Sequence, residues 1–328
     1  MNIASKPSLA EIHTTGELLA TEMIAVERKI QDSIRSRESR LTEIAFYLIG
    51  AGGKRVRPLV AMAMFRACGG EDPRDMVDLG AALELIHSAT LLHDDIIDAG
   101  EIRRGRASAY LRFGAADTLV AGDFLFSKAF EICGRFEETV VRWASEACVA
   151  LTEGEIMQAR LRRNAAVTVE DYYEIIRRKT ACLFRAGARI AAHVADADRD
   201  LVAVLARCGE AIGMAFQVID DLLDVVGDPQ KTGKPVGIDL RDGNPSLPIV
   251  LTLPRSQHLA RAWRNEDPTD GEIDVGLAEI RAGGALERVR DEAISYTRYA
   301  ADALASLPDT PYRDFLEALI AELRDRVR

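Results

Sequence analysis

Two short acidic clusters inside apolar helical stretches constrain this 328-residue chain more than any other feature. The first holds Asp94, Asp95 and Asp98 at the end of a run, starting at Ala81, that contains neither glycine nor proline. On a helix, Asp94 and Asp98 share one face a turn apart, where two like charges repel. Because the surrounding leucines and isoleucines predict burial on nearly all sides, an unpaired carboxylate there would be costly. The cluster therefore predicts a positive partner.

The second cluster, Asp220, Asp221 and Asp224, repeats this arrangement inside another apolar helical run. Either cluster alone could be a solvated acidic patch at a helix end. Two clusters together predict a cage of hard oxygen ligands. Such a cage suits Mg²⁺, because this ion takes a few carboxylates, retains water and completes its octahedron with phosphate oxygens. The pair therefore predicts a polyphosphate substrate.

Composition limits the other possibilities. Alanine, leucine, arginine and glutamate are abundant and β-branched runs bounded by turns are scarce, which predicts an all-α protein. The net charge of −10 argues against a nucleic-acid partner. We expect neither a signal peptide nor a transmembrane segment, because no stretch has the required pattern or length. The five cysteines are scattered and never form a CxxC pair, so we expect core residues of a reduced, cytoplasmic protein.

Helical periodicity organises the chain as one domain over 1–328 without internal repeats. Helices are expected at 8–36, 38–50, 59–68, 117–133, 137–162, 169–192 and 199–226. The polar, turn-rich segment 230–245 is expected to form a mobile lid, although an ordinary surface loop has the same composition. From Ser246 onward we expect short supporting helices, with a polar connector at 255–272.

Two glycine-flanked basic segments are candidates for anion binding. Lys54 and Arg57 follow a glycine cluster just before an apolar helix, a position that suits an anion. The glycine spacing does not match a nucleotide P-loop. Arg103 and Arg104 follow the first acidic cluster and could bind a diphosphate or merely neutralise the carboxylates. Lys54 and Arg57 could likewise only decorate a turn.

Two further positions are informative only beside these. His87 lies seven residues before Asp94 on the same helical stripe, so it can face the same cavity. A lone histidine on an apolar face is nevertheless more often a core residue. Lys179 and Thr180 lie in an alanine-rich apolar helical stretch, where a lysine usually extends to solvent.

Taken in order, these motifs resemble those of the trans-isoprenyl diphosphate synthase family. The likeness spans about 52–248 and comprises Gly52 to Pro58, the DDxxD at 94–98 with Arg103-Arg104-Gly105, Lys179-Thr180, Phe216-Gln217 leading to the DDxxD at 220–224, and Gly233-Lys234. The resemblance implies the isoprenoid synthase fold, a single bundle of antiparallel helices around a deep central pocket. It also implies a homodimer.

The resemblance implies a reaction as well. An allylic diphosphate ionises, isopentenyl diphosphate adds to the carbocation, and a proton is lost, which leaves a chain one isoprene unit longer. Diphosphate leaves only if its developing charge is neutralised by metal ions and cationic donors, and no nucleophilic side chain is required. In the family, the released diphosphate commonly accepts the proton.

By position, the roles known in the family fall on particular residues of this chain. The Mg²⁺ ions that bridge the allylic diphosphate would be held by Asp94, Asp95, Asp98, Asp220, Asp221 and Asp224. The same diphosphate would be bound by Arg103, Lys179 and Lys234. Isopentenyl diphosphate would be bound by Lys54, Arg57, His87 and Arg104. The carbocation would be lined by Thr180 and Gln217. In the lid, short-chain members often carry a lysine where this chain has Asn244.

Product length is predicted from the residues that precede Asp94. Ala89 and Thr90 are small where short-chain members of the family carry an aromatic floor, and Ile86 and Leu83 occupy the next turns. The first motif also has two residues between its second and third aspartate, not the four common in bacterial short-chain enzymes. A tail that extends until it meets a bulky side chain should reach about thirty carbons or more. We therefore expect a medium- to long-chain all-trans polyprenyl diphosphate, with a geranylgeranyl-length product as the alternative.

Other functions fit parts of the pattern. His93 and Asp94 resemble the pair of a helical metal-dependent phosphohydrolase, but that site needs several histidines and the chain has five in all. A non-catalytic regulatory subunit of a heteromeric prenyl synthase would lack intact acidic clusters. A terpene cyclase would not be expected to keep a second DDxxD or the Gly-Gly-Lys segment. The sequence leaves the exact product, the allylic primer and the pathway undetermined.

Overall fold

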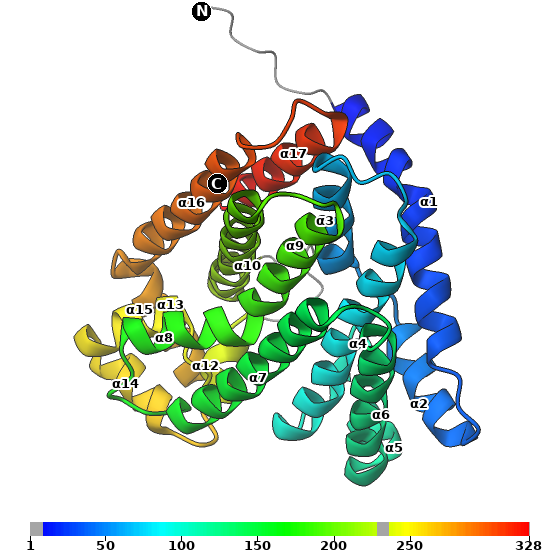
Figure 1. Ribbon diagram of the computed structural model, residues 1–328. Helices are drawn as coiled ribbons and strands as arrows, with labels where there is room; N and C mark the ends of the chain where they lie inside the picture. The colour runs from blue at the N-terminus through cyan, green and yellow to red at the C-terminus, as the bar shows by residue number, and fades with distance from the viewer. Residues whose placement is uncertain (1–8, 228–235, 328) are drawn as a thin grey trace, which may run out of the picture. The chain divides into compact units, whose positions relative to one another are not determined.

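The computed structural model describes residues 9–227 and 236–327, with side chains from Leu19 onward. Nearly every element in these ranges is a helix, and the only strands there form one short hairpin (Figure 1). The all-α prediction is therefore confirmed. The chain divides into two compact units, and the single-domain organisation stays a prediction. Unit 1 comprises Met1–Glu146, Leu183–Ala206 and Leu304–Ala318, and unit 2 comprises Ala147–Cys182, Arg207–Ala303 and Leu319–Arg328.

The elements are assigned to the units as follows. Unit 1 contains α1 (Leu9–Ser33), α2 (Ser39–Ile49), α3 (Val56–Ala67), α4 (Arg74–Ile97), β1 (Ile102–Arg103), β2 (Arg106–Ala107), α5 (Ala109–Phe113) and α6 (Ala115–Cys133). Unit 2 contains α8 (Val169–Ile176), the π-turn η1 (Arg177–Ala181), α12 (Ile238–Asp242), α13 (Leu247–Thr252), the 3₁₀ turn η2 (Leu253–Arg255), α14 (Gln257–Arg264) and α15 (Asp270–Ala282). The helices that contribute residues to both are α7 (Glu138–Leu161), α9 (Cys182–Val194), α10 (Arg199–Val226), α16 (Ala285–Leu304) and α17 (Pro311–Asp325).

Helix α4 is the central helix of unit 1 and packs against α1, α3 and α6. Its buried residues occur on every side, as expected for a helix that is apolar all round. The helix ends at its C-cap Asp98, whose backbone N–H donates to the Asp94 carbonyl over 2.8 Å. The first acidic cluster therefore occupies the last turn of a core helix.

The hairpin after α4 was not predicted from the sequence. Ile102 pairs with Ala107 and Arg103 with Arg106, so Arg104 and Gly105 form the two-residue turn. Their φ angles are +52° and +76°, the sign that the favoured two-residue hairpin turns require. The hairpin places Arg103 in the strand and Arg104 at its tip.

Two helix predictions were wrong in part. The stretch 169–192 is not one α-helix, because the π-turn η1 interrupts it between α8 and α9. The supposed connector 255–272 contains helix α14, whose N-cap Ser256 accepts a hydrogen bond from the Leu259 N–H at 3.0 Å. Leu259 and Trp263, one turn apart, are both fully buried. The segment is polar on average, so the sequence analysis missed the amphipathic helix within it.

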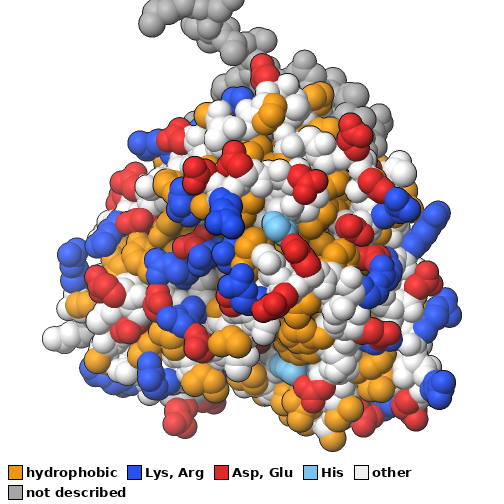
Figure 2. Space-filling model, viewed as in Figure 1, with side chains coloured by type: hydrophobic (Ala, Val, Ile, Leu, Met, Phe, Trp, Pro, Cys, Tyr) orange, Lys and Arg blue, Asp and Glu red, His pale blue; other side chains and the backbone are white. Residues whose placement is uncertain are grey.

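Cys133, Cys182 and Cys208 are buried as expected, whereas Cys68 and Cys148 are partly exposed, so the expectation of core cysteines holds for three of the five. All five cysteines are free, and burial raises the thiol pKa of Cys68 and Cys133 to about 11 and that of Cys208 to about 12. Among the described helices, α10 alone has the length and composition to cross a membrane, and 67% of its apolar window is buried in the protein. A core helix of a soluble protein can have the same length and composition, so α10 is weak evidence for a membrane span. On the face drawn in Figure 2, acidic and basic side chains are intermixed rather than gathered into one basic field.

Candidate active site

The first acidic cluster contains one buried and two partly exposed carboxylates. Asp94 and Asp98 are partly exposed, whereas the side chain of Asp95 is 0% exposed. Nε and Nη2 of Arg103 lie 2.8 and 2.6 Å from Oδ1 of Asp95. Burial raises the pKa of Asp95, and the charge of Arg103 opposes that increase. Asp95 is therefore held in an ion pair by the protein itself, which leaves Asp94 and Asp98 better placed to meet a ligand.

A set of cations surrounds His87 in the same unit. Burial, followed by the positive charges of Arg57, Arg104, Arg103 and Arg55, holds the pKa of His87 well below its usual value. His87 is therefore neutral at pH 7 and can donate one hydrogen bond and accept another. We call Arg57, His87, Arg103 and Arg104, together with Lys54, the cationic cluster; Lys54 is included by its position in the chain, directly after the glycine cluster.

The glycine loop before α3 brings two arginines close together. A Cβ added at Gly53 would lie 3.0 Å from Nη2 of Arg104 and 3.0 Å from Nη1 of Arg55, so glycine lets both guanidinium groups approach the loop backbone. Burial and then the charge of Arg55 lower the pKa of Arg104. A bound anion would reduce the repulsion between these two neighbouring cations.

Arg55, which the sequence did not single out, fixes this loop in place. Its backbone is left-handed, with φ +47°. Its Nε lies 3.0 Å from Oε2 of Glu27 and its Nη1 lies 2.9 Å from Oε1 of Glu84, whose side chain is 4% exposed. The available signal was Glu84, an acidic residue in an apolar helical run that needs a positive partner.

The second acidic cluster lies near the end of α10. Like the first cluster, it contains one buried carboxylate and two that are at least partly exposed. Asp220 is exposed and Asp221 is buried. Nε2 of Gln217 donates to Oδ1 of Asp221 at 2.9 Å, and the Leu247 N–H donates to Oδ2 at 3.1 Å. Burial raises the pKa of Asp221 to about 7, although these bonds and the Tyr172 hydroxyl lower it. Asp221 is therefore a structural centre of the cluster, and Asp220 is the member open to ligands.

Asp239 adds a fourth carboxylate that the sequence analysis missed. Asp224 accepts hydrogen bonds from the backbone N–H groups of Ile238 and Asp239, each over 3.1 Å, which fixes the start of α12. Burial, followed by the negative charges of Asp224, Asp221 and Asp220, raises the pKa of Asp239 well above its usual value. Asp239 was overlooked because it lies in the turn-rich segment outside the two acidic clusters.

These carboxylates have the chemistry of a divalent-metal site without forming a complete one alone. Among the described residues, no three histidine, cysteine, aspartate or glutamate side chains are gathered closely enough to hold a metal ion. Mg²⁺ commonly uses one or two carboxylates and takes its other ligands from water and substrate phosphates. The donor set therefore fits an ion that is bound together with a diphosphate.

The π-turn η1 positions Lys179 and Thr180. Lys179 forms an ion pair with Glu155 of α7, and the Lys179 side chain is 22% exposed. The Thr180 hydroxyl donates to Oε1 of Gln217 at 2.8 Å, and Gln217 in turn donates to Asp221. One hydrogen-bonded chain thus joins the predicted carbocation-lining residues to the second acidic cluster. Single-turn π-helices inside α-helices frequently occur at functional sites.

The close approach of α7 to η1 depends on Gly154. A Cβ there would lie 2.7 Å from the Lys179 backbone nitrogen and 2.9 Å from Cβ of Arg178. We expect Gly154→Ala to displace the turn and lower kcat about 10-fold or more, because small misplacements of catalytic groups are costly. Steady-state kinetics on both substrates would measure this. Gly271→Ala is the matched control, since a Cβ there meets no atom within 4 Å; equal rates for the two variants would contradict the assignment.

Two further residues of interest, Lys234 and Asn244, belong to the expected lid segment. Lys234 lies outside the described residues, as does much of the expected lid, whose described part includes helix α12. Oδ1 of Asn244 accepts hydrogen bonds from Gln158 at 3.1 Å and Arg162 at 2.9 Å. Asn244 therefore links the end of the lid segment to α7.

The predicted chain-length residues all lie in α4. Ala89, Ile86 and Leu83 are at most 3% exposed, and the Thr90 hydroxyl donates to the His87 carbonyl at 2.8 Å. A Cβ added at Gly187 of α9 would lie 2.9 Å from Cδ1 of Leu83, so Leu83 packs closely on that helix. These positions carry small or aliphatic side chains, and their role in product length stays a prediction.

Comparison with known proteins agrees with the family resemblance. The chain is 36% identical to octaprenyl diphosphate synthase of Escherichia coli (strain K12) over 317 residues, which cover 94% of this chain and 98% of that protein. It is 32% identical to geranylgeranyl diphosphate synthase of Methanosarcina mazei over 287 residues, 86% of this chain and 88% of that protein.

Two crystal structures share the fold. Decaprenyl diphosphate synthase from Rhodobacter capsulatus matches with a TM-score of 0.89 and 35% identity, covering 97% of this chain and 99% of that one. Polyprenyl synthase from Caulobacter crescentus CB15, complexed with calcium and isoprenyl diphosphate, matches with a TM-score of 0.90 and 34% identity over 99% of both chains. The polyprenyl synthetase family profile matches residues 38–276, a range that includes the cationic cluster and both acidic clusters. The chain therefore belongs to the polyprenyl synthetase family.

Proposed function

We propose that this protein elongates an allylic diphosphate with isopentenyl diphosphate to a medium- to long-chain all-trans polyprenyl diphosphate. The observation that carries the proposal is the gathering, within unit 1, of Arg57, Arg103 and Arg104 around His87, which belongs to the same helix that ends in Asp94 and Asp98. Carboxylates for a metal–diphosphate and cations for a second diphosphate suit the joining of two such substrates. Incorporation of labelled isopentenyl diphosphate into extractable prenyl products tests the reaction class.

The condensation needs charge neutralisation rather than a nucleophilic side chain. The allylic C–O bond breaks and releases diphosphate, a C–C bond forms to isopentenyl diphosphate, and a proton leaves the new cation. When bound, Mg²⁺ would neutralise the charge that develops on the leaving diphosphate. We assign its binding to Asp94 and Asp98 of the first acidic cluster and to Asp220 of the second, where Asp224 and Asp239 lie close to Asp220. Asp95 and Asp221 hold their neighbours in place.

The cations divide between the two substrates. We assign isopentenyl diphosphate to Lys54, Arg57, His87 and Arg104, because the neutral imidazole of His87 can donate to a phosphate oxygen without adding to the repulsion among the arginines. We assign the allylic diphosphate to Arg103, Lys179 and Lys234. Arg103 would share its guanidinium between Asp95 and that diphosphate, since Arg103 is 31% exposed.

Thr180 and Gln217 would stabilise the carbocation by their oxygen dipoles. Because Nε2 of Gln217 donates to Asp221, its amide oxygen is directed toward the Thr180 hydroxyl. This fixed orientation costs no reorganisation when positive charge develops.

Substrate partition can be tested with two lysine variants. We expect Lys54→Ala to raise the KM for isopentenyl diphosphate about 10-fold and to change the KM for the allylic substrate much less, with Lys179→Ala showing the reverse. Each lysine would lose one charge-assisted contact to a different diphosphate. Lys128→Ala, which removes a lysine paired with Glu131 on α6, is the control. If both variants affected the two substrates equally, the partition would be wrong.

The long-chain product is favoured over the alternatives. Octaprenyl, nonaprenyl and decaprenyl diphosphate synthases occur among the similar proteins, together with geranylgeranyl diphosphate synthases. Small or aliphatic residues at the predicted floor favour the longer products. A non-catalytic subunit is disfavoured because both acidic clusters are intact.

A homodimer is the favoured assembly. Helix α6 exposes Leu119, Val120 and Phe130, at 49%, 53% and 37% of their surface, and Leu119 and Phe130 share one helix face. Large apolar side chains exposed on a helix are often covered at a protein interface, and here a second copy of the chain would cover them.

A further inference from the structure

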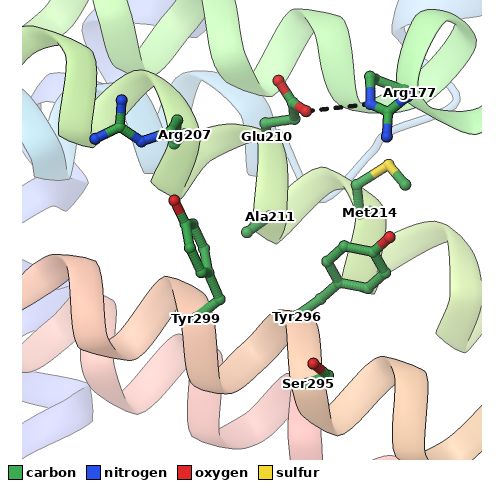
Figure 3. A pocket seen from close by; sticks show the side chains of 8 residues that line it. All are labelled: Arg177, Arg207, Glu210, Ala211, Met214, Ser295, Tyr296 and Tyr299. Carbon is green, nitrogen blue, oxygen red and sulfur yellow. Dashed lines mark ion pairs between the residues drawn. The ribbon is translucent and has the colours of Figure 1, made fainter.

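A pocket of about 270 Å³ lies in unit 2, and none of its residues has a role in the proposed reaction (Figure 3). It is formed between α10 and α16, with one residue from η1. The residues that carry the argument are Arg177, Arg207, Met214, Ser295, Tyr296 and Tyr299.

The pocket has an apolar interior with flat aromatic walls. Ala211 and Met214, about one turn apart on α10, are 4% and 1% exposed and line its inner side. Tyr296 and Tyr299, three residues apart on α16, extend their rings toward α10 in Figure 3. Tyr299 is 48% exposed, a large solvent-accessible area for an aromatic ring. Such walls favour a flat ligand, because ring stacking adds to apolar burial.

Two arginines and one glutamate line the pocket, and Arg177 is also paired with Glu174. Nε of Arg177 lies 3.3 Å from Oε1 of Glu210, so one of the two guanidinium groups is balanced by a carboxylate of the same pocket. Arg207 is exposed, and no hydrogen bond or ion pair joins it to a residue in the described ranges. One positive charge is therefore left for a ligand, and a guanidinium binds carboxylate and phosphate oxygens in a two-pronged geometry.

We infer that this pocket binds a small amphipathic anion, with a flat body of one or two rings between the tyrosines and a carboxylate or phosphate on Arg207. The volume is slightly below the roughly 300–1,000 Å³ of pockets for drug-sized ligands, so it suits a small ligand. Arg177 begins the same five-residue turn that carries Lys179, so the bound anion would contact an element of the proposed active site. The binding itself does not depend on the proposed reaction.

Calorimetric titration of the full chain with 2-naphthoate, without prenyl substrates, tests the inference. We expect saturable binding at submillimolar to millimolar concentration, with 2-naphthamide, the uncharged analogue, binding about fivefold more weakly or worse. Arg207→Gln should weaken 2-naphthoate by a similar factor because it removes the cation. Ser295→Phe, at an exposed lining position, should abolish binding by filling the pocket.

The control is Arg298→Gln, which removes an exposed arginine of α16 that does not line the pocket and should leave 2-naphthoate binding within about twofold. Circular dichroism establishes that each variant is folded. Absence of saturable binding to the wild-type chain would overturn the inference. So would wild-type affinity in both Arg207→Gln and Ser295→Phe, which would place the probe elsewhere, for example in a diphosphate site.

Discussion

Replacing Asp94 with alanine is expected to lower kcat/KM by about 10³-fold or more while leaving the helical fold intact. Asp94 and Asp98 are partly exposed carboxylates one turn apart at the end of α4. Removing one relieves repulsion in the ligand-free protein but removes a ligand of the metal–diphosphate complex. The same loss is expected for Asp220→Ala. Activity assays in Mg²⁺ with circular dichroism would separate catalytic loss from unfolding.

Asp95 provides the contrast, because its carboxylate is buried against Arg103. Asp95→Ala would leave that guanidinium without its partner and is expected to destabilise the protein by about 2–4 kcal/mol. Chemical denaturation would measure this difference. Asp75→Ala, an exposed acidic residue in the first turn of the same helix, should change activity less than about twofold. Near-native activity of Asp94→Ala or Asp220→Ala would show that the metal assignment is wrong.

The second large effect is expected on product length. Ala89 is 0% exposed and lies five residues before Asp94 in α4, where a growing tail would run away from the metal. Each added CH₂ that becomes buried contributes about 0.8 kcal/mol, so growth should continue until a bulky side chain stops it. Ala89→Tyr should place a floor there and shorten the product from about thirty carbons or more to about fifteen or twenty, with some overpacking cost.

Chromatographic sizing of the products would measure this change, and turnover of the first condensation should change little. Ala89→Ser, which keeps the side chain small, is the matched control and should preserve the wild-type product. An unchanged product distribution in Ala89→Tyr would mean that the floor lies elsewhere.

The sequence predicted the site best where polar residues interrupted an apolar pattern. Asp94 and Asp220 were identifiable because carboxylates in apolar helices need an explanation. Asp239 has the same electrostatic setting in the structure, but it stands in a polar segment where an aspartate is unremarked. The sequence also did not show that Arg55, rather than Arg57, pairs with Glu84, because this ion pair joins distant parts of the chain.

The sequence also did not predict the π-turn η1 or the helix α14. The residues of η1 have ordinary helical propensities, so nothing local predicts a π-turn. Its nearest sequence signal is Gly154 in another helix, where the absence of a side chain allows the approach that pairs Lys179 with Glu155. Helix α14 was missed for a different reason, since its three buried residues, Leu259, Ala262 and Trp263, are separated by arginines and polar neighbours. Pairings between distant segments, rather than local patterns, decide both features.

The most direct test of the proposed function is to incubate the purified protein with Mg²⁺, isopentenyl diphosphate and each allylic primer in turn, and to size the extracted products. The account predicts that products grow by successive five-carbon units to about thirty carbons or more with at least one primer. Termination at fifteen carbons would contradict the predicted product length, and the absence of any condensation product with every primer would contradict the proposed reaction.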